Sequence, residues 1–179
     1  MIKFPVKYFN KIVPDAFHGT ELETARKIRN DKKFIINLSE QNYLGDGVYF
    51  YEASLEHAKI WGRRKSKNGK IGVIRSAINL GRCLDLHNKD HLNFLRETAN
   101  GLSGRTKKVL TDTFVINFVA QLADNSGNKI DTIRATHARN IRLSAKIFRG
   151  SRFYYDIALM ICVRNLKNII TCSLIYKGD

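Results

Sequence analysis

Two short glycine-bearing motifs in the first third of the chain carry side chains suited to holding a nucleotide. The first is His18-Gly19-Thr20, and the second is Tyr43-Leu44-Gly45-Asp46-Gly47-Val48-Tyr49-Phe50. A histidine ring nitrogen can hydrogen-bond a ribose hydroxyl, and a tyrosine ring can stack on a flat heterocycle. Glycine lets the backbone approach a ligand closely. The two motifs together predict that one imidazole and one phenol ring face a common cleft.

Each motif also has an interpretation without chemistry. His18 alone is compatible with a partly buried histidine at the end of a strand. Tyr49 lies in a β-forming run, where a tyrosine more often packs in a core, and Gly45-x-Gly47 is compatible with a simple turn. The ligand-binding interpretation therefore depends on the two motifs occurring together.

The rest of the chain predicts a single α+β domain over residues 1–179, with a core rich in β-structure. The length suffices for one hydrophobic core, and 44% apolar with 26% charged residues is a globular composition. We expect Thr20 to cap the first helix in a capping box with Glu23, Ser54 to cap the second, and Gly62 to end it. The hydrophobic periodicity predicts strands at 16–18, 48–51, 71–80, 83–86, 153–163 and 169–176, and helices at 21–29, 54–62, 90–99 and 109–123.

Positive charge is concentrated after residue 60. The net charge is +15, and residues 61–179 hold 22 basic and eight acidic residues, which is +14 of that total. This asymmetry favours a polyanionic partner, with nucleic acid first and an acidic protein second, although charge also keeps a chain soluble. Phe153, Tyr154 and Tyr155 suit either stacking on bases or core packing. The expected phosphate contacts are Arg63, Arg64, Lys65, Lys67, Arg149 and Arg152, with other arginines of 134–152.

Several classes of protein are disfavoured. No apolar run approaches the roughly 20 residues of a membrane span, and no apolar segment follows the first lysines as in a signal peptide. Cys83, Cys162 and Cys172 lack metal-ligand spacing, so we expect reduced, buried thiols in a cytoplasm. His87 and His91 have a spacing that zinc uses, but no third ligand is near them in the sequence, so we expect exposed helix residues and no metal site.

The two motifs resemble the ADP-ribosyltransferase superfamily, in the branch that contains poly(ADP-ribose) polymerases and diphtheria toxin. That branch shows His-Gly-Ser/Thr, then Gly-x-Gly-Ile/Val-Tyr-Phe, then a helix with a serine, an alanine and an aromatic residue, which here are Ser54, Ala58 and Trp61. The resemblance covers 16–62 well and is weaker over 71–86 and 153–176. The continuous stretch from Leu44 to Glu52 also resembles small bacterial relatives, some of which act as toxins or phage-defence effectors.

The resemblance implies a split, twisted β-sheet core with flanking helices, and NAD as a substrate held in the cleft. His18 would bond the ribose on the nicotinamide side, the backbone of Gly19 would bind the carboxamide, and Tyr49 and Tyr43 would stack on the nicotinamide ring. The NAD-binding set that it implies is His18, Gly19, Thr20, Tyr43, Gly47, Tyr49 and Ser54.

The chain departs from this family at the third catalytic position. The family usually places a glutamate on a late strand, where it contacts the ribose 2′-hydroxyl and orients the acceptor, but all six glutamates of this chain precede residue 98. On the expected late strand, Asp156 and Met160 share a face. The best alignment places Met160 at the glutamate position, with Asp156 as a substitute and Glu52 as another candidate. The implied catalytic residues are then His18, Tyr49 and Asp156.

From the resemblance and the charge, we predict a mono-ADP-ribosyltransferase that modifies nucleic acid, RNA before DNA. It would act in the cytoplasm as the toxin of a toxin–antitoxin or phage-defence system, with an antitoxin protein as partner and no membrane. The alternatives are a protein-directed transferase, an NAD glycohydrolase, an RNA 2′-phosphotransferase, or an inactive module that binds NAD, ADP-ribose or RNA. The arginine and histidine set of the phosphotransferase is not evident in this sequence.

Overall fold

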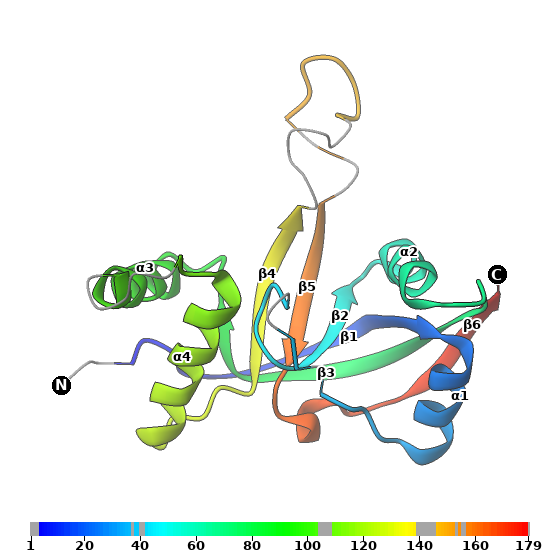
Figure 1. Ribbon diagram of the computed structural model, residues 1–179, viewed down its shortest axis with the longest axis horizontal. Helices are drawn as coiled ribbons and strands as arrows, with labels where there is room; N and C mark the ends of the chain where they lie inside the picture. Colours follow the sequence, from blue (N-terminus) through cyan, green and yellow to red (C-terminus); the bar gives the residue numbers. More distant parts are fainter. Residues whose placement is uncertain are drawn as a thin grey trace.

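A six-stranded sheet and four α-helices make up the described part of the chain (Figure 1). The structure is a computed structural model that describes residues 4–36, 38–39, 42–103, 109–138, 146–152, 154 and 157–178. The strands are β1 (Tyr8–Glu21), β2 (Val48–Glu52), β3 (Ile71–Asp85), β4 (Thr132–Ala138), β5 (Ile157–Val163) and β6 (Ser173–Gly178). The helices are α1 (Leu22–Asp31), α2 (Leu55–Lys65), α3 (Lys89–Ser103) and α4 (Asp112–Asn125), with a 3₁₀ turn η1 at Leu166–Asn168.

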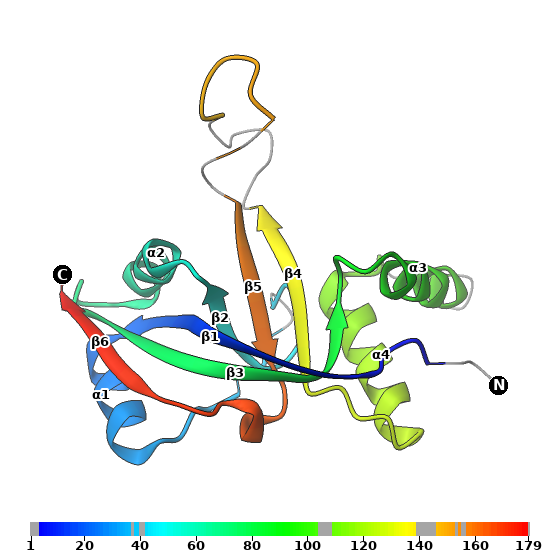
Figure 2. The ribbon, with the colours of Figure 1, turned by 180° about the vertical axis from the view of Figure 1, so that it is seen from behind.

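Five of the strands close into a barrel. The order is β1-β2-β5-β4-β3-β6, and β3 also pairs with β1, which leaves β6 as an extra strand along β3. The pairing of β3 with β4 is parallel, and the other pairings are antiparallel. Figure 1 shows α1 and α2 at one end of the sheet and α3 and α4 at the other, with β4 and β5 standing between them; Figure 2 shows the same arrangement from behind.

The barrel opens between β1 and β2. These strands pair only at Ala16 with Glu52 and at Phe17 with Tyr51. Beyond Phe17, β1 continues along β3 as far as the pair of Glu21 with Ile71, while β2 continues along β5. The two strands therefore diverge at the positions of His18 and Tyr49.

Several local predictions are confirmed. The structure is α+β, and helices form in all four predicted regions, as do strands in the predicted 48–51 and 71–80 regions. Ser54 is the N-cap of α2, where its hydroxyl accepts a hydrogen bond from the backbone N–H of His57 at 3.4 Å. Thr111 caps α4 in the same way, through the N–H of Phe114 at 3.2 Å.

Other local predictions are wrong. Thr20 does not cap α1: it stays in β1, because pairing with Gly72 of β3 holds it extended, and Glu21 is the N-cap without a side-chain bond. Gly62 does not end α2, which continues to Lys65. The predicted strands 71–80 and 83–86 form the single strand β3, which ends at Asp85. Gly81, with a φ of 56°, lies within this strand without ending it.

Gly19 permits the close approach of α2 to β1. A Cβ at this position would overlap the carbonyl oxygen of Ala58 and lie 3.1 Å from the nitrogen of Gly62. Gly62 itself is close to β1, because its own added Cβ would lie 3.3 Å from the nitrogen of Thr20. The glycine of the first motif therefore serves helix–strand packing directly beside the site.

We predict that Gly19→Ala lowers the free energy of unfolding by about 1–3 kcal/mol, the usual cost of overpacking. Chemical denaturation measures it. Gly101→Ala is the matched control, because Gly101 lies in α3 with open space around its added Cβ, and its stability should be unchanged or slightly higher. Equal stability of the two variants would contradict the packing described for Gly19.

Candidate functional site

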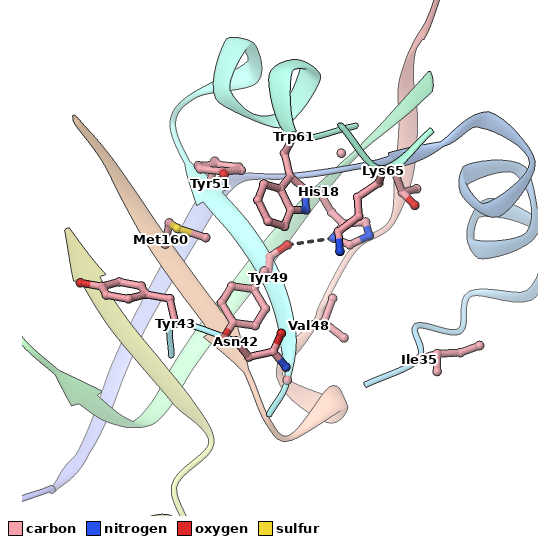
Figure 3. A pocket seen from close by; sticks show the side chains of 13 residues that line it. His18, Ile35, Asn42, Tyr43, Val48, Tyr49, Tyr51, Trp61, Lys65 and Met160 are labelled. Atoms are coloured by element: carbon pink, nitrogen blue, oxygen red, sulfur yellow. Dashed lines mark hydrogen bonds between the residues drawn. The ribbon is translucent and has the colours of Figure 1, made fainter. Parts of the chain in front are cut away.

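A cleft with a volume of about 290 Å³ opens where β1 and β2 diverge, between these strands, β5 and α2 (Figure 3). Six of the seven residues that sequence analysis assigns to NAD line it: His18, Gly19, Thr20, Tyr43, Gly47 and Tyr49. Sequence analysis did not assign seven other lining residues to NAD: Ile35, Asn42, Val48, Tyr51, Trp61, Lys65 and Met160. The two motifs therefore meet at one cleft.

The His18 ring bridges the gap between the strands. Its Nδ1 donates a hydrogen bond to the backbone carbonyl of Tyr49 at 2.8 Å, drawn as the dashed line in Figure 3. Because a carbonyl oxygen can only accept, Nδ1 carries the proton, and Nε2 is an acceptor in the neutral ring. Phe34 and Phe50 pack against the imidazole, each at 5.6 Å between ring centres, and burial lowers the pKa of His18. The ring is thus neutral at pH 7.

The phenol of Tyr49 anchors the loop that precedes it. Its hydroxyl accepts from the N–H of Leu44 at 2.8 Å and donates to the carbonyl of Gly45 at 2.7 Å. Burial, as the largest cause, raises the pKa of Tyr49. The hydroxyl therefore stays protonated, and both of its hydrogen bonds are made within the protein. The part of Tyr49 that can contact a ligand is the face of its ring.

A polar network fixes the same loop from outside. The Asn117 side-chain oxygen accepts from the N–H of Asp46 at 3.0 Å and from Arg164 at 2.8 Å, and Arg164 also donates to the carbonyl of Asp46 at 3.0 Å. Gly45, with a φ of 73°, makes the turn. Sequence analysis missed Asn117 and Arg164. The available signal was one asparagine within the apolar run of the helix predicted at 109–123.

Tyr51 and Lys65 add polar groups to the cleft wall. Tyr51 is 6% exposed, its ring stacks on His57, and its hydroxyl makes no hydrogen bond within the described residues. Burial raises the pKa of Tyr51 to about 12, so the hydroxyl remains a donor. The Lys65 ammonium lies 5.2 Å from the centre of the Trp61 ring. Sequence analysis expected Lys65 to bind nucleic acid, and the structure places it at the cleft.

The three candidates for the third catalytic position differ in placement. Met160 lies opposite Tyr51 in the β2–β5 ladder and lines the cleft. Glu52 is turned to the other face of β2 and forms a bidentate ion pair with Arg134, at 2.6 and 3.0 Å. Asp156 lies outside the described residues, as do Phe153 and Tyr155.

Ser54 and Arg134 have roles other than those expected. Ser54 does not line the cleft: its hydroxyl caps α2 and lies 2.6 Å from Nδ1 of His57. Arg134, one of the arginines expected to hold phosphates, bonds Asp85 at 3.2 Å as well as Glu52, and 13% of its side chain is exposed. Its charge is therefore matched by two carboxylates.

The other expected phosphate contacts that the structure describes are exposed, whereas Arg139 and Arg142 lie outside the described residues. Arg63 and Arg64 lie with Lys65 in the last turn of α2, and Lys67 follows the helix. Arg149 and Arg152 lie in residues 146–152, drawn in orange in Figure 1, which project beyond the ends of β4 and β5. Phe148, 65% exposed, is in the same segment.

The expected exposure of His91 is wrong. His91 is buried and accepts the backbone N–H of Asp85 at 3.0 Å, while His87 lies between Asp85 and Thr136 at 2.8 and 2.7 Å. The described residues contain no group of three His, Cys, Asp or Glu side chains that could hold a metal. The three cysteines are unpaired; Cys83 and Cys162 are buried and Cys172 is partly buried. None of the described helices is both long and apolar enough to traverse a bilayer.

The chain is similar to an uncharacterised protein of Methanocaldococcus jannaschii. The two are 25% identical over 173 residues, which cover 83% of this chain and 81% of that protein. No family model matches the chain, and no solved structure matches it.

We predict that His18 destabilises the fold as the pH falls. Its folded-state pKa lies below the unfolded value of about 6.5, so the unfolded state binds the proton more readily, and the free energy of unfolding decreases below about pH 6.5. NMR titration of the ring should give a pKa below that value. His18→Gln should show a smaller loss of stability between pH 7.5 and 5.5 than the parent protein does. Identical losses would refute the stated burial of the ring.

Proposed function

We propose that this protein is an NAD-dependent mono-ADP-ribosyltransferase whose acceptor is a nucleic acid. The observation that carries the proposal is the meeting of His18 and Tyr49, 31 residues apart in the chain, at one cleft. These are the two residues that the resemblance assigns to binding the ribose and the nicotinamide ring of NAD. The opening of the sheet between β1 and β2 also fits the split sheet that the resemblance implies.

Each group has a role suited to loss of nicotinamide. Nε2 of His18 accepts a hydrogen bond from a ribose hydroxyl, because the ring's proton is on Nδ1, which donates to the Tyr49 carbonyl. The ring of Tyr49 stacks on nicotinamide. Tyr43 lines the same cleft, and its hydroxyl donates a hydrogen bond to the carbonyl of Thr136 at 3.1 Å. When the bond from ribose C1′ to nicotinamide breaks, positive charge develops on the sugar, and a neutral imidazole does not oppose that charge.

The charge distribution supports a nucleic acid as acceptor. The basic residues exceed the acidic ones by 14 after residue 60, and the projecting segment 146–152 combines Arg149 and Arg152 with the exposed ring of Phe148. Lysine and arginine bind phosphates, and an exposed aromatic ring can stack on an unpaired base. We place the activity in the cytoplasm, as a toxin or phage-defence effector controlled by an antitoxin, on the resemblance alone.

A module that binds NAD without transferring ADP-ribose is the second candidate. Met160 favours it, because a methionine at the cleft cannot replace a carboxylate in contacting the ribose or the acceptor. Release of free nicotinamide from NAD distinguishes the two candidates.

We predict that Tyr49→Ala and His18→Ala each reduce transfer from labelled NAD to RNA, DNA or protein by about tenfold or more. Tyr49→Ala removes a ring whose stacking contributes roughly 1–3 kcal/mol, and His18→Ala removes both the acceptor for the ribose and the hydrogen bond to the Tyr49 carbonyl. Tyr49→Phe should keep more activity than Tyr49→Ala, because it keeps the stacking ring. Tyr8→Ala, which removes an exposed tyrosine outside the cleft, is the control and should keep full labelling. Full labelling by Tyr49→Ala would exclude this cleft as the site.

We further predict that Arg149→Gln with Arg152→Gln weakens RNA binding and makes it less dependent on salt. Losing two phosphate contacts on a single strand should reduce the slope of log K against log salt by about 1.4. Filter binding or anisotropy from 50 to 200 mM salt measures it. Lys27→Gln with Arg29→Gln removes the same charge from α1 and should leave the slope unchanged. Equal slopes for both double variants would show that the projecting segment does not contact the RNA phosphates.

A further inference from the structure

The first half of β1 is an exposed edge of the sheet, drawn in dark blue in Figure 2. Residues 8–12 are all exposed, and they include three large apolar side chains: Tyr8 is 60% exposed, and Phe9 and Ile12 are each 53% exposed. On one side this segment pairs with β3. On the other side, within the described residues, β1 pairs with β2 only from Ala16 onward. An open edge of this kind is a template on which another chain can form a strand.

Both ends of this edge are anchored. Before it, Val6 is buried, and the ring of Phe4 packs edge-to-face on Phe94 of α3 at 4.9 Å between ring centres. After it, Val13 and Ala16 are buried in the core. The segment between these anchors is therefore extended before any partner binds, which lowers the entropy lost on binding.

A bulge keeps two of the apolar side chains on one face of the edge. Phe9 lies opposite Gly81 and Ile12 lies opposite Asn79, so the register shifts by one residue between the two pairs. Gly81 and Asn79 are two residues apart on β3 and share a face, and directly opposed residues share a face as well. Gly81 has no side chain to cover Phe9. The edge thus offers two neighbouring apolar side chains beside its outward backbone groups.

Positive charge flanks these apolar side chains. The first 14 residues contain three lysines and no acidic residue, and two of the lysines, Lys7 and Lys11, are exposed beside the edge. The whole chain carries a net charge of +15. Two copies of this edge would bring like charges together, so pairing between copies is disfavoured. An acidic partner is attracted where a second copy is repelled.

We propose that the first half of β1 binds an extended, acidic segment of another protein, which joins the sheet as a strand beside β1. Alternate N–H and C=O groups of β1 point away from β3. A peptide strand supplies acceptors and donors to these groups, and its apolar side chains pack on Phe9 and Ile12.

A protein is favoured over a nucleic acid at this edge. A phosphodiester backbone has acceptors but no N–H donors for the outward carbonyls, and Ile12 has no ring to stack on a base. None of residues 8–12 lines the cleft, so the inference is independent of the proposed NAD chemistry.

Charge-matched peptides test the edge. An eight-residue peptide of alternating glutamate and valine, and its twin with lysine in place of glutamate, are titrated with the full chain, and binding is measured by fluorescence anisotropy. The glutamate peptide should bind at least about tenfold more tightly. Amide hydrogen exchange should slow in residues 8–12 when this peptide is bound. Equal binding of the two peptides, or unchanged exchange at 8–12, overturns the proposal.

Two double charge reversals separate a local effect from the net charge. Lys7→Glu with Lys11→Glu should weaken binding of the glutamate peptide at least about tenfold. Lys27→Glu with Arg29→Glu makes the same change of net charge on α1 and should weaken binding by less than about twofold, because salt screens distant charges. Equal unfolding midpoints show that both variants are folded. Equal weakening in the two double variants contradicts a site on β1.

Two other occupants of the edge are distinguished by the same measurements. A single-stranded RNA that slows exchange in residues 8–12 more than the glutamate peptide does would make this edge a nucleic-acid surface. A dimer in sedimentation that dissociates on Ile12→Lys would make it an interface between two copies. Either result overturns the proposal. A monomer whose edge is protected by the glutamate peptide, and not by RNA, supports it.

Discussion

The hydrogen bond from His18 to the Tyr49 carbonyl spans the gap at which the sheet opens. The β1–β2 ladder ends at Phe17 and Tyr51, and one step further the imidazole reaches the strand that the backbone no longer pairs with. The same contact fixes the tautomer of the ring and ties the two motifs to each other. The cleft is thus the gap in the ladder, and His18, which lines the cleft, also holds its two strands together.

The motif glycines act mainly through packing around that gap. Gly19 lets α2 approach β1, and an added Cβ on Gly47 would contact the sulfur of Cys162 and the carbonyl of Val163 on β5. Gly45 has the positive φ that turns the loop beneath Tyr49. Sequence analysis expected these glycines to admit a ligand. In the structure they bring helix, loop and strands close together, so that the His18 ring reaches the backbone of Tyr49 and both side chains line one cleft.

Features with a local cause were predictable from the sequence, and features set by distant partners were not. The Ser54 cap, the strand at 48–51 and the helix at 109–123 follow from neighbouring residues, and the structure contains all three. Thr20 has the residue pattern of a helix cap, but pairing with Gly72 of β3 holds it extended. The sequence around Thr20 does not indicate that pairing. Of the predicted NAD-binding set, Ser54 alone does not line the cleft, because it is committed to capping α2.

The distant ion pairs also decide which charges reach the cleft. Glu52 follows Tyr51 directly, yet alternation along the strand turns it away from the cleft, and Arg134 binds it there with Asp85. Because they bind each other, neither the Glu52 carboxylate nor the Arg134 guanidinium faces the cleft. Among the described residues that line the cleft there is then no aspartate or glutamate, and Lys65 is the one lysine or arginine.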